Sequence, residues 1–276
     1  MVEAIKVINR LIVIKLSGKN IDDVACLEDV SRQSVVLQKL GAQVILVHGG
    51  GQRINLALKD AGIIPKFHDG QRITDDATME IVAKVLGEEV NHQLAESIRQ
   101  KGGEVICGKQ TQVLRSAPLS NNSDDVSLGR VGKVVEVKPL LNQFRDQGGG
   151  QDGVLDGKIA VIAPTARDIT DNSEYNINAD WAATAIAAAY QADYLFYMTD
   201  QEGILGSEHK AIERIDQEQI SQLIEQGIVT DGMIPKILSM REALQQGVKQ
   251  IAVVNGFTRN IICDFLDGKS AGTTIY

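Results

Sequence analysis

The chain has 276 residues, of which 43% are hydrophobic, and it carries 26 glycines against only 5 prolines. This composition is typical of a globular protein with a full core, and it excludes a disordered or fibrous chain. The formal net charge is −8, and the Lys and Arg residues form no cluster of the kind that binds nucleic acid. Apolar runs fall short of the ~20 residues that span a bilayer, and the first residues lack the long apolar stretch of a signal peptide. We therefore expect a soluble, cytoplasmic protein that binds small molecules.

Short β-branched runs alternate with longer helical patterns along the chain. Strands are predicted at residues 11–16, 43–47, 158–163, 194–198 and 250–254. Helices are predicted at residues 22–40, 52–61, 75–101, 179–191, 216–226 and 234–246. This order predicts an α/β fold, a three-layer αβα sandwich with a central, mainly parallel sheet whose apolar strands are covered on both faces.

The segment 104–140 breaks this rhythm with alternating polar and apolar residues. It predicts a protruding β-hairpin region with a mobile, polar tip around residues 116–125, and such hairpins often cover a ligand. The glycine-rich stretch 147–153 predicts a flexible turn. The three cysteines, Cys26, Cys107 and Cys263, are too few and too far apart for a disulfide framework or a zinc site, and we interpret them as small core residues.

Three consecutive glycines, Gly49, Gly50 and Gly51, lie between the predicted strand at 43–47 and the predicted helix at 52–61. Their N–H groups would lie at the carboxyl end of a strand and at a helix N-terminus, where anions bind. A tight turn is the alternative, but a turn needs one glycine rather than three. We therefore predict an anion site.

The first predicted strand ends in a similar way, with Lys15, Ser17 and Gly18. A lysine inside an apolar strand is unfavourable unless its ammonium group finds a partner. The alternative is that the side chain reaches past the strand to solvent.

Two further segments lie at the starts of predicted helices: residues 175–180, which include Asn178 and Asp180, and residues 230–236, which end at Lys236. Asn178 and Asp180 have an alternative role as a helix cap and a complement to the helix dipole. The second segment has an alternative role as an ordinary loop and helix start. Taken singly, neither segment decides between these roles.

Taken together, these residues form an ordered series of motifs from residue 11 to Thr273. The series comprises Lys15–Gly18, His48–Gly51, Gly70–Asp75, Val90–Asn91, Leu128–Gly132, Asn176–Asp180, Thr199–Asp200 with Gly203–Leu205, and Asp231–Lys236. It resembles the acetylglutamate kinases of the amino-acid kinase family. Ordered agreement over nearly the whole chain is more specific than any single motif.

The resemblance implies transfer of the γ-phosphoryl group of MgATP to the side-chain carboxylate of N-acetyl-L-glutamate, which gives an acyl phosphate in arginine biosynthesis. A carboxylate is ionised at neutral pH, so this nucleophile needs no general base. It needs relief from anionic repulsion instead, because phosphoryl transfer depends on positioning and charge stabilisation. The resemblance gives that task to Lys15 and Lys236, with Asp180 holding both ammonium groups.

The resemblance also implies the binding residues. Those for phosphate and ATP are Ser17, Gly18, Gly50, Gly51, Asp200, Gly203 and Gly232, and those for the acyl amino acid are Gly50, Gly51, Arg72, Asn176 and Asn178. Residues 1–190 would form an N-terminal lobe for substrate binding and dimerisation, and residues 191–276 a C-terminal lobe for ATP. We expect Mg²⁺ to be held by phosphates and water, without a protein metal site.

The chain departs from the family pattern at three places. Ser17 replaces a glycine, residues 107–111 read Cys-Gly-Lys-Gln-Thr where the family resembles Ser-Gly-Lys-Asp-Gly, and residues 142–157 form a longer stretch than usual. Only ten residues precede Leu11, where arginine-inhibited members have an extra helix. We expect a homodimer without strong arginine feedback.

Two other functions remain open from the sequence. One is a kinase for another acceptor, such as aspartate, glutamate, carbamate or a nucleoside monophosphate, although Arg72 and residues 176–180 fit an acylated amino acid better. The other is a non-catalytic ligand sensor of the same fold. Such a sensor should have lost a lysine or the aspartate, but this chain has kept Lys15, Asp180 and Lys236.

Overall fold

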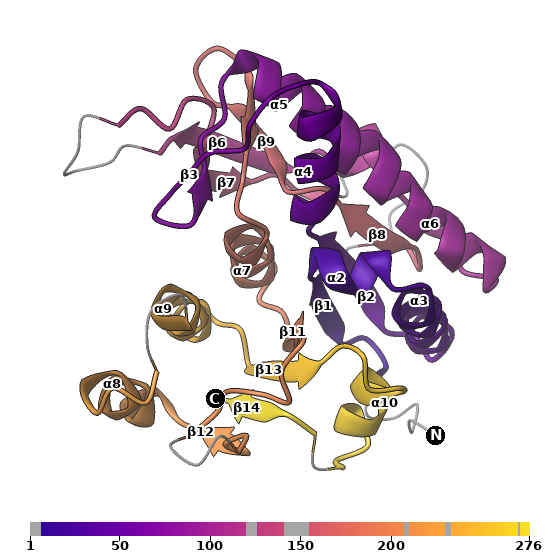
Figure 1. The fold of residues 1–276 in the computed structure, drawn as a ribbon. Helices are drawn as coiled ribbons and strands as arrows, with labels where there is room; N and C mark the ends of the chain where they lie inside the picture. Colours follow the sequence, from indigo (N-terminus) through magenta and orange to yellow (C-terminus); the bar gives the residue numbers. More distant parts are fainter. Residues whose placement is uncertain (1–6, 120–125, 141–154, 207–209, 230–232, 270) are drawn as a thin grey trace.

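A computed structural model describes residues 7–119, 126–140, 155–206, 210–229, 233–269 and 271–276. Within these residues the centre of the molecule is an eight-stranded sheet (Figure 1). Its strands, in spatial order, are β12 (Arg214–Ile215), β14 (Thr273–Ile275), β13 (Gln250–Asn255), β11 (Tyr194–Thr199), β1 (Leu11–Leu16), β2 (Gln43–His48), β8 (Ile159–Ile162) and β5 (Val105–Ile106). The six strands from β13 to β5 are parallel, whereas β14 is antiparallel to β13 and parallel to β12.

Helices cover both faces of this sheet. On one side lie α3 (Val24–Lys39), α6 (Asn91–Gln100) and α10 (Ile261–Leu266), and on the other lie α7 (Ala179–Ala189), α8 (Gln217–Glu225) and α9 (Met233–Gln245). The side chains of β1 alternate between the two cores: Ile12, Ile14 and Leu16 pack with the first group, and Leu11 and Val13 with the second. The predicted three-layer αβα fold is confirmed.

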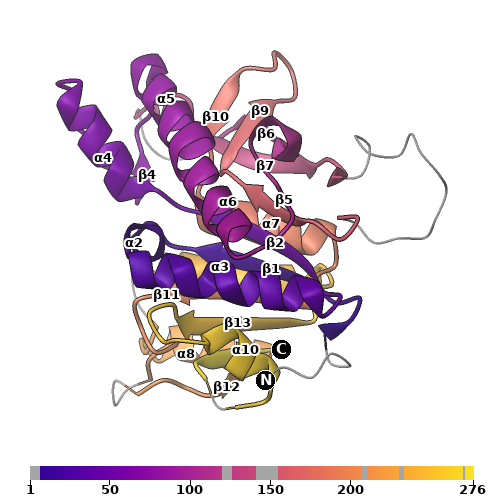
Figure 2. The same cartoon turned by 90° about the vertical axis from the view of Figure 1, so that its right-hand side faces the viewer.

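A four-stranded sheet extends the molecule at one end. Its order is β10 (Glu174–Asn176), β9 (Thr165–Asp168), β6 (Leu114–Pro118) and β7 (Gly132–Val137). Figures 1 and 2 place this sheet and α5 (Asp76–Ala83) at one end, and α8 and β12 at the other. The antiparallel pair β6–β7 confirms the predicted hairpin. Of the predicted mobile tip at 116–125, residues 116–118 belong instead to strand β6, and residues 120–125 lie outside the described residues, as does the stretch 147–153.

The remaining elements lie between those already described or beside them in the chain. They are α2 (Gly18–Asp22), α4 (Gly51–Asp60), the hairpin β3–β4 (Phe67–His68 and Gln71–Arg72), a π-helical segment (Lys84–Val90) and a 3₁₀ turn (Gly108–Thr111). The single helix predicted at 75–101 is therefore divided, because the π-helical segment separates α5 from α6. Of the cysteines, Cys26 is buried as predicted, and Cys107 and Cys263 are partly buried.

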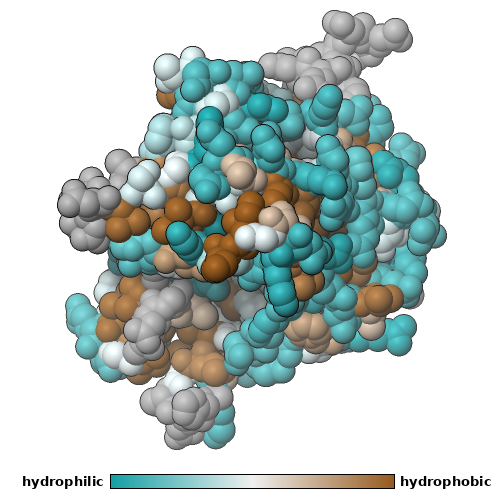
Figure 3. Space-filling model, turned by 45° about the horizontal axis from the view of Figure 1, so that its top comes forward, coloured by the Kyte–Doolittle hydropathy of each residue, from teal (hydrophilic) through white to brown (hydrophobic). Residues whose placement is uncertain are grey.

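The molecular surface is mainly polar on the face drawn in Figure 3, with a band of hydrophobic residues across its middle. Exposed large hydrophobic residues include Leu56 of α4, Ile64 and Phe67. Within the described part of the chain, no helix combines the length and the apolar character that a membrane crossing requires.

Candidate active site

Asp180 lies between two lysines that come from distant parts of the chain. Lys15 Nζ is 2.7 Å from Asp180 Oδ1, and Lys236 Nζ is 3.8 Å from Asp180 Oδ2. The side chains of Lys15 and Asp180 are 11% and 13% exposed, whereas that of Lys236 is 43% exposed. Each carboxylate oxygen therefore faces a different ammonium group, one buried and one open to solvent.

The fold explains how these three side chains meet. Lys15 shares the face of β1 that packs against α7, because it alternates with Leu11 and Val13. Asp180 lies in the first turn of α7, where a negative charge complements the helix dipole, and Lys236 lies in the first turn of α9. The lysine predicted to need a partner inside an apolar strand thus has one.

Two opposing effects set the ionisation of Asp180. Burial alone would raise the pKa of this carboxyl group, but Lys15 and Lys236 lower the pKa by more than burial raises it. The net pKa is below the ordinary aspartate value. Asp180 is therefore ionised at neutral pH and neutralises part of the charge of the two lysines.

The two glycine turns lie against each other beside this triad. A Cβ atom on Gly18 would come within 3.5 Å of Gly50 N, and one on Gly49 would come within 3.1 Å of Gly18 N. Helix α4 begins at Gly51, and its N-cap, Gly50, supplies no side-chain hydrogen bond. Because no side chain at the N-cap satisfies them, the N–H groups of the first turn of α4 can bind an anion, as the predicted anion site requires.

Two residues with predicted ligand contacts have their side chains in helix caps. The Ser17 hydroxyl donates to Asn20 Oδ1 over 2.7 Å and accepts from Asn20 N, so it caps α2. Asn178 Oδ1 accepts from Asp180 N over 2.8 Å and caps α7. The phosphate contact of Ser17 and the substrate contact of Asn178 stay predictions.

The predicted substrate residues Arg72 and Asn176 lie close together, linked through Thr74. The Thr74 hydroxyl donates to Arg72 O over 2.7 Å, and Asn176 Nδ2 donates to Thr74 Oγ1 over 3.4 Å. Arg72 Nη2 donates to Gly51 O over 3.2 Å, and its guanidinium lies 4.7 Å from the centre of the Phe67 ring. Arg72 is buried, and its Nη1 atom has no partner among the described residues.

The residues predicted to lie near ATP are only partly described. Asp200, at the end of β11, pairs with Lys19 over 2.5 Å, and this hydrogen bond is the main cause that lowers the pKa of Asp200. At Gly203 a Cβ atom would lie 2.6 Å from Thr273 Oγ1, so this turn requires a glycine. Gly232 lies outside the described residues. Sequence reasoning missed Lys19 and Thr74; the signal for Lys19 is its position directly after Gly18.

A large cavity lies away from the triad. It has a volume of about 1090 Å³ and is lined by residues of α5, the π-helical segment, the 3₁₀ turn and β9, including Lys84, Lys109 and Arg167. None of Lys15, Asp180 or Lys236 lines it. The paired lysines, the carboxylate and the N-terminus of α4 lie instead near the carboxyl ends of β1 and β2.

Comparison with known proteins decides the family. Residues 10–255 match the family model described as the amino acid kinase family. The chain belongs to the amino acid kinase family. The resemblance stated from the motifs is thereby confirmed.

Within this family, curated relatives match almost the whole chain. The acetylglutamate kinase of Trichlorobacter lovleyi is 34% identical over 276 residues, which cover 96% of this chain and 91% of that protein. The acetylglutamate kinase of Methylobacterium nodulans is 35% identical over 277 residues, which cover 96% of this chain and 88% of that protein.

Solved structures show the same fold. The N-acetylglutamate synthase of Neisseria gonorrhoeae, complexed with coenzyme A and N-acetyl-glutamate, has a TM-score of 0.85 at 19% identity; the match covers 99% of this chain and 60% of the synthase. A protein of Streptococcus mutans has a TM-score of 0.73 at 28% identity, with 96% and 98% coverage. The carbamate kinase of Giardia lamblia, bound to AMP-PNP, has a TM-score of 0.68 at 17% identity, with 97% and 98% coverage.

Proposed function

We propose that this chain is an acetylglutamate kinase, an ATP-dependent phosphotransferase of arginine biosynthesis. It transfers the γ-phosphoryl group of MgATP to the side-chain carboxylate of N-acetyl-L-glutamate and yields an acyl phosphate. The observation that carries the proposal is the placement of Asp180 between Lys15 and Lys236, at 2.7 Å and 3.8 Å, beside the free N-terminus of α4. Relatives that are 34% and 35% identical bear the name of this enzyme.

The two lysines stabilise charge on the transferring phosphoryl group. The acceptor carboxylate is already ionised and needs no base to activate it. The protein must mainly reduce the electrostatic repulsion between this carboxylate and the triphosphate. Lys15 and Lys236 supply positive charge on that path, and the N–H groups of Gly18, Gly50 and Gly51 bind phosphate oxygens. Two ammonium groups ~4 Å apart repel by about 4 kcal/mol at an effective dielectric constant of 20, which explains an anionic residue between them.

Arg72 binds the α-carboxylate of the substrate in this proposal. Its buried guanidinium has a free Nη1 atom, and no carboxylate among the described residues pairs with it. Burial also lowers the pKa of Arg72, so an anion would relieve the cost of holding this charge away from water. A guanidinium fits a carboxylate with two parallel hydrogen bonds. Asn176 lies beside Arg72 and binds the acetamido group, with Asn178 at the start of α7.

Nucleotide binding falls to the C-terminal lobe, residues 191–276, and to the glycine turns. Asp200, Gly203 and Gly232 would contact ATP, and Lys19 lies beside Asp200. Within the described residues no group of three or more His, Cys, Asp or Glu is placed to hold a metal ion. We propose that Mg²⁺ enters with ATP and is held mainly by phosphate oxygens and water, because Mg²⁺ keeps several of its waters and binds substrate phosphates.

We propose further that the N-terminal lobe, residues 1–190, binds the acyl amino acid and forms a homodimer. The eight-stranded sheet ends in this lobe at the two-residue strand β5, whose outer edge pairs with no other described strand. Sedimentation should then give twice the mass of one chain. A cytoplasmic location stays a prediction from the sequence.

Hydroxylamine trapping tests the reaction, because hydroxylamine intercepts acyl phosphates and not phosphate monoesters. The protein is incubated with MgATP and, separately, N-acetylglutamate, glutamate, aspartate or carbamate. We expect hydroxamate with N-acetylglutamate and little with the other acids. If another acid gave hydroxamate and N-acetylglutamate did not, the proposed kinase reaction would still hold, but the proposed substrate would be wrong.

A further inference from the structure

A buried histidine stands directly before the glycine turn of β2. His48 is the last residue of β2, is completely buried, and has its Nδ1 atom 3.1 Å from Gly49 O. A carbonyl oxygen can only accept, so Nδ1 must carry the hydrogen of this bond. In neutral imidazole the other nitrogen, Nε2, is then an acceptor.

Asn91 supplies the matching donor. Its Nδ2 atom lies 3.1 Å from His48 Nε2 and 3.1 Å from Val161 O, while its Oδ1 atom accepts from Gly108 N over 2.8 Å. Because Val161 offers an oxygen and Gly108 an N–H, the orientation of the Asn91 amide is fixed by its neighbours. Asn91 therefore selects the tautomer of His48 that donates to Gly49 O.

The bond from His48 constrains the peptide that presents Gly50. In a trans peptide the carbonyl of Gly49 and the N–H of Gly50 point in opposite directions within one plane. A carbonyl held toward the buried ring therefore turns the Gly50 N–H away from it. Gly49 is also fixed through its own N–H group, which donates to Leu16 O over 2.8 Å.

We propose that His48 is a positioning residue for phosphoryl transfer: its Nδ1–H holds the Gly49 carbonyl, so that the Gly50 N–H faces the phosphate, and Asn91 locks the required tautomer. This inference rests on the kinase function proposed above and deepens it. It gives a role to the histidine of the His48–Gly51 motif, which belongs to no group of three or more metal-ligating side chains among the described residues.

The surroundings of His48 keep this arrangement constant over the working pH range. Burial is the main cause that lowers the pKa of His48 to about 4, with Arg53 adding to the effect and the bond to Gly49 opposing it. The ring is therefore neutral at physiological pH. Its one N–H hydrogen stays on Nδ1, because Nε2 accepts from Asn91.

Two substitutions separate the two nitrogens of the ring. In His48→Asn the amide nitrogen takes the place of Nδ1 and keeps the donor to Gly49 O. In His48→Gln the amide takes the place of Nε2 and keeps the contact with Asn91, but the donor to Gly49 O is lost. We expect kcat to fall by tenfold or more in His48→Gln and by less than about threefold in His48→Asn, with both KM values within about threefold.

Thr111→Val is the matched control. The Thr111 hydroxyl is buried, with its oxygen 2.8 Å from the same Val161 carbonyl oxygen that Asn91 contacts and 3.0 Å from Gly108 O, and its single hydrogen can be donated to either. Its loss should lower the melting temperature as much as a histidine substitution while kcat stays unchanged. Equal losses of kcat in His48→Asn and His48→Gln, or a similar loss in Thr111→Val, would overturn the positioning role.

A measurement on the unliganded wild-type protein separates this inference from the proposed reaction. Long-range ¹H–¹⁵N NMR reports which ring nitrogen of His48 carries the hydrogen, with no substrate and no variant. We expect hydrogen on Nδ1, and hydrogen on Nε2 would overturn the inference whatever the activity. A wild-type protein that traps no acyl phosphate, in contrast, would overturn the proposed reaction.

Discussion

Asp180 combines two electrostatic effects that would be unfavourable alone. A buried carboxylate without partners loses hydration, and two neighbouring ammonium groups without an anion repel each other. The structure brings these groups together, with the more exposed lysine, Lys236, at the longer distance of 3.8 Å. Moving toward a ligand would therefore cost Lys236 less of its interaction with Asp180 than it would cost Lys15.

This difference leads to a prediction for Lys236→Ala. Its ammonium group interacts most strongly as charge develops in the transition state, so we expect kcat to fall about 10²- to 10³-fold, with a small change in KM for N-acetylglutamate. Steady-state kinetics by hydroxamate formation would measure both. Lys249→Ala is the control, because Lys249 is also exposed and also pairs with an aspartate, Asp193, but at a site remote from Asp180. An unchanged kcat in Lys236→Ala would remove this lysine from the mechanism.

The neutral His48 predicts a loss of stability in acid. Its pKa is about 4 in the folded state and ~6.5 when unfolded, so between these values the unfolded chain takes up a proton that the native protein does not. Proton uptake by the unfolded state lowers the free energy of unfolding as pH falls, by roughly 3 kcal/mol at pH ~4. Above pH ~6.5 the ring is neutral in both states and this loss is absent.

Urea unfolding of the wild type and of His48→Asn, at a series of pH values between ~7 and ~4, isolates this effect. Asparagine does not titrate, so the stability advantage of the wild type should shrink as pH falls. A difference that stays constant over this range would show that His48 takes up a proton as readily in the native protein as in the unfolded chain.

The π-helical segment packs against the glycine turn after β2. A Cβ atom on Gly50 would lie 2.7 Å from Leu86 Cδ2, within this segment, whereas Gly51 has open space around its Cα. The two adjacent glycines therefore have different surroundings. A side chain at position 50 would overlap Leu86 unless that residue shifts, whereas position 51 leaves room beside the first N–H groups of α4.

Gly50→Ala should destabilise the protein by roughly 1 to 3 kcal/mol, because the methyl group overlaps Leu86. Adding Leu86→Ala should recover part of this loss, since it removes the atom that the methyl group meets. Chemical denaturation of both single variants and the double variant gives the coupling energy. Gly51→Ala is the control and should show no coupling to Leu86→Ala, and additive effects in the Gly50 pair would contradict the predicted contact.

The sequence predicted elements that are long or apolar and missed those that are short. Five strands of the main sheet and most of the longer helices lie where their periodicity placed them, because burial on both faces leaves a strong pattern. Helices α2 and α10 have five and six residues, too few for a helical period to show. The π-helical segment has an ordinary helical sequence, so its widened turn depends on packing.

The candidate site was predictable to different degrees. The need of Lys15 for a partner follows from its place in an apolar strand, but the identity of that partner came from the family resemblance. The link between Thr74 and Asn176 joins residues 102 positions apart, and no local pattern reports such a contact. Ser17 was expected at the phosphate, yet its cap of α2 depends on Asn20, which is not one of the usual Glu or Gln residues of a capping box.

Helix α7 lies between the elements that carry the two lysines of the candidate site. Figure 1 shows this helix between the part that holds the four-stranded sheet and the part that holds α8 and α9. Asp180 lies in its first turn and thereby connects Lys15 of the main sheet with Lys236 of α9. A ligand that contacts both lysines therefore changes the surroundings of the start of α7.

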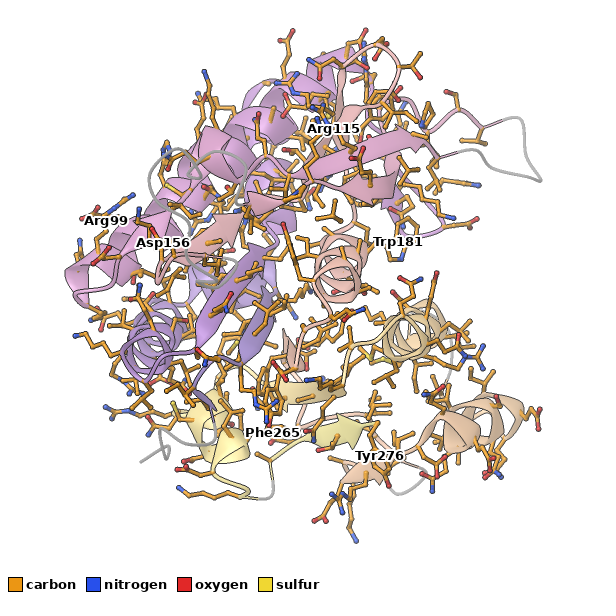
Figure 4. The ribbon with its side chains drawn as sticks, turned by 180° about the vertical axis from the view of Figure 1, so that it is seen from behind. Arg99, Arg115, Asp156, Trp181, Phe265 and Tyr276 are labelled. Carbon is orange, nitrogen blue, oxygen red and sulfur yellow. The ribbon has the colours of Figure 1, made fainter. Side chains whose placement is uncertain are left out.

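Trp181 provides a probe of that change, because it is the single tryptophan of the chain and follows Asp180 directly. It is partly exposed, and Figure 4 shows it on α7 between the two parts of the molecule. We expect MgATP to change its fluorescence in a saturable way, because the charge of the triphosphate and the movement of Lys236 alter the field at the indole ring. A titration excited at the red edge of tryptophan absorption, with free N-acetyltryptophanamide as the control for absorption by ATP, would measure it. In Lys236→Ala the change should be weaker or require more ATP, and a response identical to that of the wild type would show that the signal arises without this lysine.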